Sequence, residues 1–282
     1  MPSRRLPWSV LLAVALASIG CRDAATVERS PSRMDELGGD LVVGHDQADQ
    51  LDQAEQLDDD DDSTHGFAFA SNTLSGKPRK SVLVGNMDEL ECNKELKKLK
   101  IPHVRAPGAA KIDQPIILTG PINGVDFDTG RPYKQRSIAA GDAIDCRLAV
   151  SLYDLTKVAK KHGIATVIVK SFHRPNQAIL DPNAPLRHRI GFAIDIAGFV
   201  TKKGKTWNVE KDFHGKIGQT TCGSSAAKPS PDTKVARELW SVFCEVVAST
   251  SFDSGISPNY NASHFDHVHF DLTTDHPILF FP

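Results

Sequence analysis

The sequence predicts an α+β fold for residues 80–282, and three observations predict it. Residues 141–163 and the segment that begins at Pro231 carry apolar side chains at helical spacing. Residues 164–171 form a β-branched run, and residues 267–270 alternate polar and apolar side chains as a strand does. The hydrophobic content of 40% is sufficient for a packed core.

The N-terminal part predicts export. Two arginines precede an apolar run from Trp8 to Ile19, which is too short to cross a bilayer of ~30 Å as a helix. We therefore predict that residues 1–21 are a secretion signal. Ile19-Gly20-Cys21 resembles a bacterial lipobox, with Ser18 in place of the usual Leu, and predicts that a lipidated Cys21 anchors the chain to the membrane, facing the periplasm or cell surface. Cleavage nearby with release of a soluble protein is the alternative.

Residues 22–79 predict a disordered acidic linker. Residues 22–66 carry fourteen acidic and three basic side chains, a net charge of −11, and Asp58–Asp62 is an unbroken acidic run. Self-repulsion and few apolar residues keep such a segment extended. A calcium loop is the alternative for the run, but the spaced ligands and the Gly turn of such loops are absent from the sequence.

The first part of the domain predicts short elements. Residues 81–85 are typical of a short strand, and residues 88–100 of a helix that Pro102 ends. Residues 104–136 are rich in Pro and Gly around the apolar run 115–118, which predicts loops and a strand pair.

Two long helices are predicted further along. The first occupies residues 141–163, with Asp142 as its N-terminal cap and basic residues at its negative end. The strand at 164–171 follows it directly. The Lys- and Gly-rich stretch 199–209 predicts a hairpin, and Pro231 begins the second helix.

Four cysteines remain in the mature chain after Cys21. An even number in an exported protein fits two disulfides, among three possible pairings. Adjacency in the sequence favours Cys92 with Cys146 and Cys222 with Cys244. A cysteine-ligated zinc is the alternative, but CxxC spacing is absent from the sequence.

Two remote segments carry the residue types of a zinc site. HRIGFAID supplies His188 and Asp195, and HFDHVHFD supplies His267 and His269. Side chains two apart on a strand share a face, so both imidazoles can converge on one point. A catalytic zinc takes three ligands of the His, Asp or Glu type and leaves a position for water. We predict one Zn2+ held by His188, Asp195 and His269; ordinary structural histidines are the alternative.

These residues resemble a known pair of motifs. His188, Gly191, Ala193 and Asp195 match the motif SxHxxGxAxD of the LAS group of zinc peptidases, and residues 266–269 match its later HxH or ExxH. The run AIDIAGF, the cysteine pattern and the ending NASHFDHVHFD look like the bacterial extensin-like C-terminal family, over about residues 80–282.

The resemblance implies a small central antiparallel sheet flanked by helices, the LAS/hedgehog-like peptidase fold. It also implies a zinc-dependent hydrolase that acts on peptide bonds of bacterial peptidoglycan, of the D,D-carboxypeptidase or endopeptidase type. His267 and Asp266 are both candidates for the base that takes a proton from water. Arg174 resembles an arginine that contacts the substrate or polarises its carbonyl; a surface arginine before Pro175 is the alternative.

Two departures from the motifs keep a second function open. Leu186 stands where the motif has Ser, and Asp266 stands where ExxH has Glu. A non-catalytic, zinc-stabilised cell-wall-binding module of the same fold is therefore the alternative function. In either case the expected partners are peptidoglycan stem peptides and, through Cys21, the membrane. Lys and Arg are spread along the chain without interleaved aromatics, which argues against nucleic acid.

Overall fold

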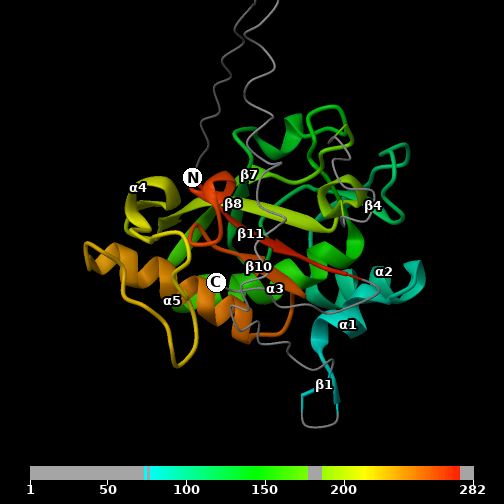
Figure 1. Ribbon diagram of the computed structural model, residues 1–282. Coiled ribbons are helices and arrows are strands. Elements are labelled where there is room, and N and C mark those ends of the chain that lie inside the picture. The colour runs from blue at the N-terminus through cyan, green and yellow to red at the C-terminus, as the bar shows by residue number, and fades with distance from the viewer. Residues whose placement is uncertain (1–72, 75–76, 177–185, 274–282) are drawn as a thin grey trace, which may run out of the picture. The chain divides into compact units, whose positions relative to one another are not determined.

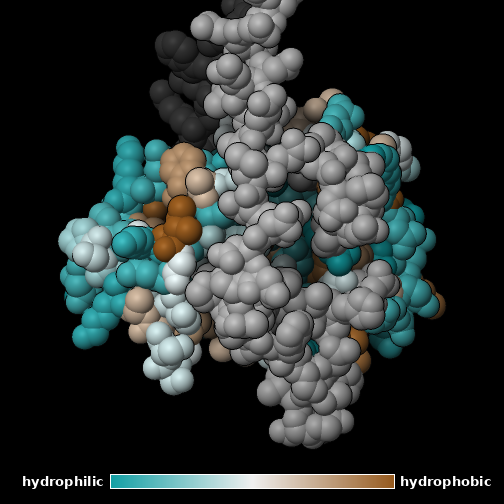
Figure 2. Space-filling view, viewed as in Figure 1, coloured by the Kyte–Doolittle hydropathy of each residue, from teal (hydrophilic) through white to brown (hydrophobic). Residues whose placement is uncertain are grey.

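The computed structural model describes residues 73–74, 77–176 and 186–273 and has the predicted α+β class (Figure 1). The predicted secretion signal, the lipidation site at Cys21 and nearly all of the acidic linker lie outside the described residues. No helix in the described part is long and apolar enough to span a membrane. On the face shown in Figure 2, hydrophilic residues make up most of the coloured surface, and the apolar patches are small.

The main sheet has six strands in the order β10-β11-β8-β7-β5, with β9 paired to β8. Its members are β5 (Asp126–Asp128), β7 (Ile164–Ser171), β8 (Ala193–Thr201), β9 (Thr206–Asn208), β10 (Ser254–Ile256) and β11 (Val268–Asp271). The predicted antiparallel arrangement is correct for every pair except β5 and β7, which run parallel. The predicted strand at 164–171 and the predicted hairpin at 199–209 are confirmed.

A smaller sheet joins β3 (His103–Arg105), β4 (Pro115–Leu118) and β6 (Ala143–Asp145), all antiparallel. It contains the strand pair predicted within residues 104–136. A two-residue pair, β1 (Thr73–Leu74) and β2 (Lys77–Pro78), precedes the domain.

Helices cover one face of the main sheet. The two long ones, α3 (Cys146–Lys161) and α5 (Lys234–Ala248), lie side by side against it (Figure 1). Phe243 of α5 packs on Phe270 of β11, with ring centroids 5.3 Å apart. Side chains alternate along a strand, so the neighbours of the core-facing residues on β8 and β11 point to the opposite face. That opposite face carries the histidines.

Three shorter helices complete the domain: α1 (Lys80–Gly85), α2 (Glu89–Leu99) and α4 (Val209–Asp212). The predicted helix at 88–100 is confirmed, and Asp88 caps it by accepting from the backbone N–H of Glu91. The predicted strand at 81–85 is wrong, because this segment is α1. Its buried residues Ser81, Val84 and Gly85 follow helical spacing, and so short an apolar run does not distinguish a helix from a strand.

The N-terminal cap of α3 also differs from the prediction. Asp142 accepts hydrogen bonds from Arg131 and from the backbone N–H of Ser137, so its carboxylate holds the preceding loop. The helix begins three residues later than the capping prediction required, after β6, and Asp145 caps it through the backbone N–H of Arg147.

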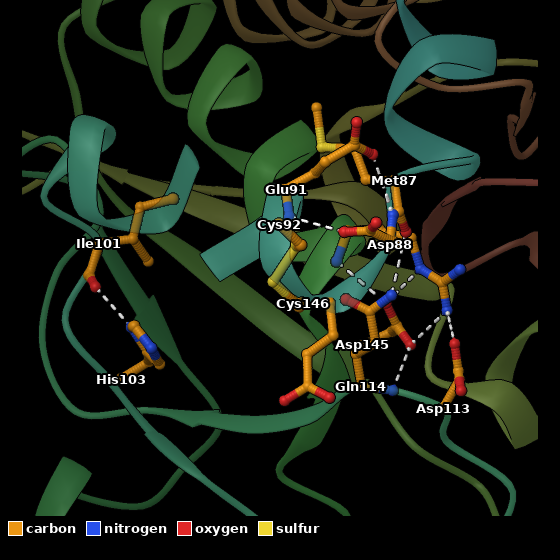
Figure 3. The surroundings of a disulfide bond; sticks show 12 residues. Met87, Asp88, Glu91, Cys92, Ile101, His103, Asp113, Gln114, Asp145 and Cys146 are labelled. Carbon is orange, nitrogen blue, oxygen red and sulfur yellow. Dashed lines mark hydrogen bonds and ion pairs between the residues drawn. A yellow bond between two sulfur atoms is a disulfide. The ribbon is translucent and has the colours of Figure 1, made fainter. Parts of the chain in front are cut away.

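Both predicted disulfides are present. Cys92 pairs with Cys146 and joins α2 to the start of α3, and Cys222 pairs with Cys244 and joins a loop to α5. The first bond lies beside the capped end of α2 and the Asp145 carboxylate (Figure 3). Each bond therefore fixes a helix that covers the sheet.

Loss of the Cys92–Cys146 bond is expected to destabilise the domain more than loss of Cys222–Cys244. The two bonds close loops with sequence separations of 54 and 22 residues. Chain entropy then predicts a loss of about 4 kcal/mol for the longer loop and roughly 1 kcal/mol less for the shorter one. Guanidinium unfolding of the two double Cys→Ser variants, followed by circular dichroism, measures both. The reverse order of stability would contradict the loop-closure explanation.

Candidate metal centre

The first half of the site is a tight turn that leads into β8. His188 lies in the 3-10 helix η3 (Arg187–Ile190), and Gly191 follows it with a φ of 73°. A Cβ atom at Gly191 would lie 2.7 Å from the backbone nitrogen of Asp145, so the turn requires glycine both for its conformation and for its space. The turn places the His188 ring over the beginning of the strand that carries Asp195.

The second half of the site comes from sheet register. Asp195 on β8 lies directly opposite His269 on β11 and opposite Ser171 on β7. Directly paired residues on neighbouring strands point to the same face, so these three side chains form one row across the sheet. The flanking residues Ile194 and Ile196 belong to the hydrophobic core, as expected for the opposite face.

A β-bulge in β7 completes this row. Val169 pairs with Ile196, but Ser171, two residues on, pairs with Asp195, the adjacent residue of β8. Lys170 is therefore the extra residue of the bulge. Without the bulge Ser171 would share the core side with Val169, so the irregularity turns the serine hydroxyl toward Asp195.

The three predicted metal ligands meet at one point and are buried. The His188 Nε2 atom lies 3.1 Å from Asp195 Oδ1, and the His269 Nδ1 atom lies 2.8 Å from the same oxygen. The two imidazole nitrogens are 3.3 Å apart. Among the described residues, these three form the one group whose ligand atoms all lie within 4.8 Å of one another. We call His188, Asp195 and His269 the ligand group.

The outer nitrogens of both rings already have acceptors. His188 Nδ1 contacts the carbonyl oxygen of Phe172, and His269 Nε2 lies 3.1 Å from Asp271 Oδ2. A carbonyl or carboxylate oxygen only accepts, so each outer nitrogen carries the hydrogen and each inner nitrogen presents a lone pair. Two lone pairs and a carboxylate oxygen at such distances require a cation or a proton between them, and this donor set fits Zn2+.

The pKa values of the cluster are shifted by burial and by the contacts between its members. Burial raises the pKa of Asp195, but its contacts with His188 and His269 outweigh burial and hold the pKa well below its usual range. Burial lowers the pKa of His269, but Asp195 and Asp271 raise it to about 9. Burial lowers the pKa of His188 and favours its neutral form. Without metal, a proton on His269 therefore occupies the position between the acceptors.

The two candidate bases lie at the edge of the cluster. His267 precedes β11, and its Nε2 atom is 3.6 Å from Asp195 Oδ1. Its Nδ1 atom is 2.8 Å from Asp266 Oδ1. Asp266 thus contacts the imidazole of His267 on the side away from the ligand group. Burial lowers the pKa of His267 and outweighs the opposite effect of Asp195 and Asp266.

Arg174 and Ser171 hold the other oxygen of Asp195. Arg174 Nη2 donates to Asp195 Oδ2 at 2.7 Å, and Ser171 Oγ donates to it at 2.6 Å. The motif has a serine near the site at the position of Leu186, which has no hydroxyl. In this chain Ser171 of β7 supplies a hydroxyl instead. Sequence reasoning missed Ser171 because its role depends on the bulge.

His264 is a second residue that sequence reasoning missed. Its ring centroid lies 5.0 Å from that of His267 and 6.3 Å from that of His269. Burial, and repulsion from His267 and His269 when these are protonated, lower its pKa to about 3, so it is neutral at physiological pH. Its Nδ1 atom lies 2.7 Å from Asn261 Oδ1. The signal available in the sequence was its place three residues before His267.

Comparison with known proteins identifies one family. The model of the family "Extensin-like protein C-terminus" matches residues 183–279, which include His188, Asp195, His267 and His269. No curated protein and no solved structure matches the chain. The expected similarity to the extensin-like C-terminal family is therefore supported over this part of the chain, whereas a LAS-type fold has no support from a solved structure.

Zn2+ binding to the metal-free chain is expected to release at least one proton near pH 7.5, that of His269. His269 has a pKa raised to about 9, so it is protonated at that pH and must lose the proton from Nδ1 to become a ligand. The affinity should therefore rise with pH until about pH 9. Isothermal titration calorimetry in buffers of different ionisation enthalpy counts the proton. A heat of binding independent of the buffer would contradict the assignment.

Ser171→Ala is expected to weaken Zn2+ binding about tenfold. The substitution removes the hydroxyl that donates to Asp195 Oδ2, and outer partners of metal ligands typically contribute 10–100-fold to affinity. Ser241→Ala is the matched control, since this serine contacts a carboxylate on α5, on the other face of the sheet. Competition with a fluorescent zinc chelator measures both variants. Equal affinities for the two would show that the hydroxyl does not support the ligand.

Proposed function

We propose that this chain is an exported zinc-dependent peptidase that hydrolyses peptide bonds of bacterial peptidoglycan, of the D,D-carboxypeptidase or endopeptidase type, with a LAS-like arrangement of site residues. One observation carries the proposal. A third imidazole, that of His267, faces the ligand group without belonging to it, with Nε2 3.6 Å from Asp195 Oδ1. A structural metal site does not need such a group, whereas a hydrolase needs a base there.

His188, Asp195 and His269 would hold the zinc ion. A zinc ion bound by three such ligands acts as a Lewis acid on a carbonyl and lowers the pKa of bound water from ~15.7 toward ~7. The protein itself supplies the proton acceptor. Because His267 Nδ1 donates to Asp266, its Nε2 atom carries a lone pair toward the site. That nitrogen accepts the proton of the attacking water and can return it to the leaving amine.

Arg174 fits the binding of an anionic substrate group. Its side chain is 44% exposed, although Nη2 donates to the buried Asp195. A guanidinium has five N–H donors, so Arg174 can also donate to a substrate carboxylate or to a developing oxyanion. A terminal carboxylate is the group that distinguishes the substrate of a carboxypeptidase from that of an endopeptidase.

Two disulfides support the proposed location outside the cytoplasm, because such bonds persist in oxidising compartments. Together with the predicted secretion signal and lipidation at Cys21, they favour a membrane-anchored protein that faces the periplasm or cell surface, where peptidoglycan is the substrate within reach. The alternative is a soluble periplasmic or secreted protein.

Incubation of the purified chain with muropeptides tests the proposal. Zinc-loaded protein is expected to produce new fragments in mass spectra, and a chelator should abolish them. His267→Ala should lower kcat about 10²–10⁴-fold with zinc still bound, since it removes the proton acceptor. His103→Ala, a histidine that contacts the carbonyl of Ile101, is the control and should retain full activity. Zinc-dependent binding of muropeptides without new fragments would instead identify a non-catalytic wall-binding module.

A further inference from the structure

Lys170 lies on the site face of β7, where strand alternation from the core-facing Val169 places it. It is the extra residue between the pairs Val169–Ile196 and Ser171–Asp195, and the bulge brings Ser171 to the same face. Its Nζ atom lies 2.7 Å from both carboxylate oxygens of Asp266, and the side chain is 42% exposed. Lys170 of β7 thus holds Asp266, which lies in the segment that leads into β11.

The contacts of Asp266 decide which nitrogen of His267 carries the hydrogen. His267 Nδ1 lies 2.8 Å from Asp266 Oδ1 and 3.4 Å from Lys170 Nζ. The shorter contact is the stronger, and since a carboxylate only accepts, it is a hydrogen bond from Nδ1–H; the 3.4 Å contact with Lys170 is too long to compete with it. The lone pair of His267 is therefore on Nε2, which faces Asp195.

We propose that Lys170 is a positioning residue for the proposed peptidase: its ammonium group holds the Asp266 carboxylate so that His267 keeps Nδ1 protonated and Nε2 directed at the ligand group. The inference rests on the proposed function for its catalytic meaning, but the contacts it describes are between the protein's own side chains. Lys170 itself is not the base, and it acts through Asp266.

This role differs from that of an ordinary surface ion pair. An exposed pair contributes about 0–1 kcal/mol to stability and nothing to a distant group. The pair of Lys98 and Glu95 on α2, with Nζ 2.8 Å from Oε1, has that character. Lys170 instead contacts a carboxylate whose other partner is the imidazole nearest the ligand group. Loss of its charge should therefore affect His267 and leave stability nearly unchanged.

Long-range ¹H–¹⁵N spectra of the histidine rings in the metal-free full-length chain provide the first test. The wild type is expected to show His267, assigned with His267→Gln, as the Nδ1–H tautomer. Lys170→Met should convert it to a mixture of tautomers, whereas Lys170→Arg, which retains the charge, should preserve Nδ1–H. Lys98→Met is the matched control and should not change the spectrum. An unchanged His267 tautomer in Lys170→Met would overturn the inference.

Kinetics of the zinc-loaded chain on muropeptides provide the second test. Lys170→Met should lower kcat about tenfold with KM within twofold of the wild type, and Lys170→Arg should restore most of kcat. A raised KM with unchanged kcat would overturn the inference and assign Lys170 to substrate binding. If the wild type cleaves nothing, the proposed peptidase function fails, and the tautomer spectra still decide whether Lys170 positions His267.

Discussion

The site depends on one buried carboxylate, that of Asp195. Its side chain lies on a central strand of the sheet, where an uncompensated charge would be costly. Its two oxygens therefore have separate partners. Oδ1 faces the imidazole nitrogens of His188 and His269, and Oδ2 accepts from Ser171 and Arg174. Three elements bring these partners to Asp195. The turn at Gly191 positions His188, the neighbouring strand β11 carries His269, and the other neighbouring strand, β7, carries Ser171.

The sheet provides the rigidity that such a cluster needs. Asp195 and His269 are direct cross-strand neighbours, so the Cα positions of two ligands are fixed by backbone hydrogen bonds. The core side chains on the other face of the same strands pack against α3 and α5, and the disulfides fix one end of each helix. A shift of β11 by one residue would turn His269 into the core and Phe270 out of it, so core packing and ligand placement enforce the same register.

The sequence was sufficient for features that local pattern determines. The residues His188, Asp195 and His269 could be predicted because two short motifs contain them, and the strand at 164–171 because its β-branched run is long enough. Local sequence pattern was insufficient where tertiary contacts determine the secondary structure or the role of a side chain. The segment 81–85 is a helix because its buried side packs against the rest of the domain, and Asp145 caps α3 because β6 occupies the residues between Asp142 and the helix. Ser171 joins Lys170 on the site face through a bulge, and strand alternation alone would have placed the two on opposite faces.

Two aspartates of similar chemistry take different roles because their surroundings differ. Asp195 is surrounded by imidazoles and lies inside the ligand group, whereas Asp266 is partly exposed and lies outside it. Burial raises the pKa of Asp266, but its hydrogen bonds with Lys170 and His267 lower it overall, so this carboxylate stays ionised at neutral pH. An ionised carboxylate so firmly held is a poor proton acceptor and a good orienting group for an imidazole. In the proposed peptidase, the replacement of the motif's Glu by Asp266 therefore does not remove the base. It transfers that role to His267, and the shorter side chain of Asp266 suits a contact with the adjacent ring.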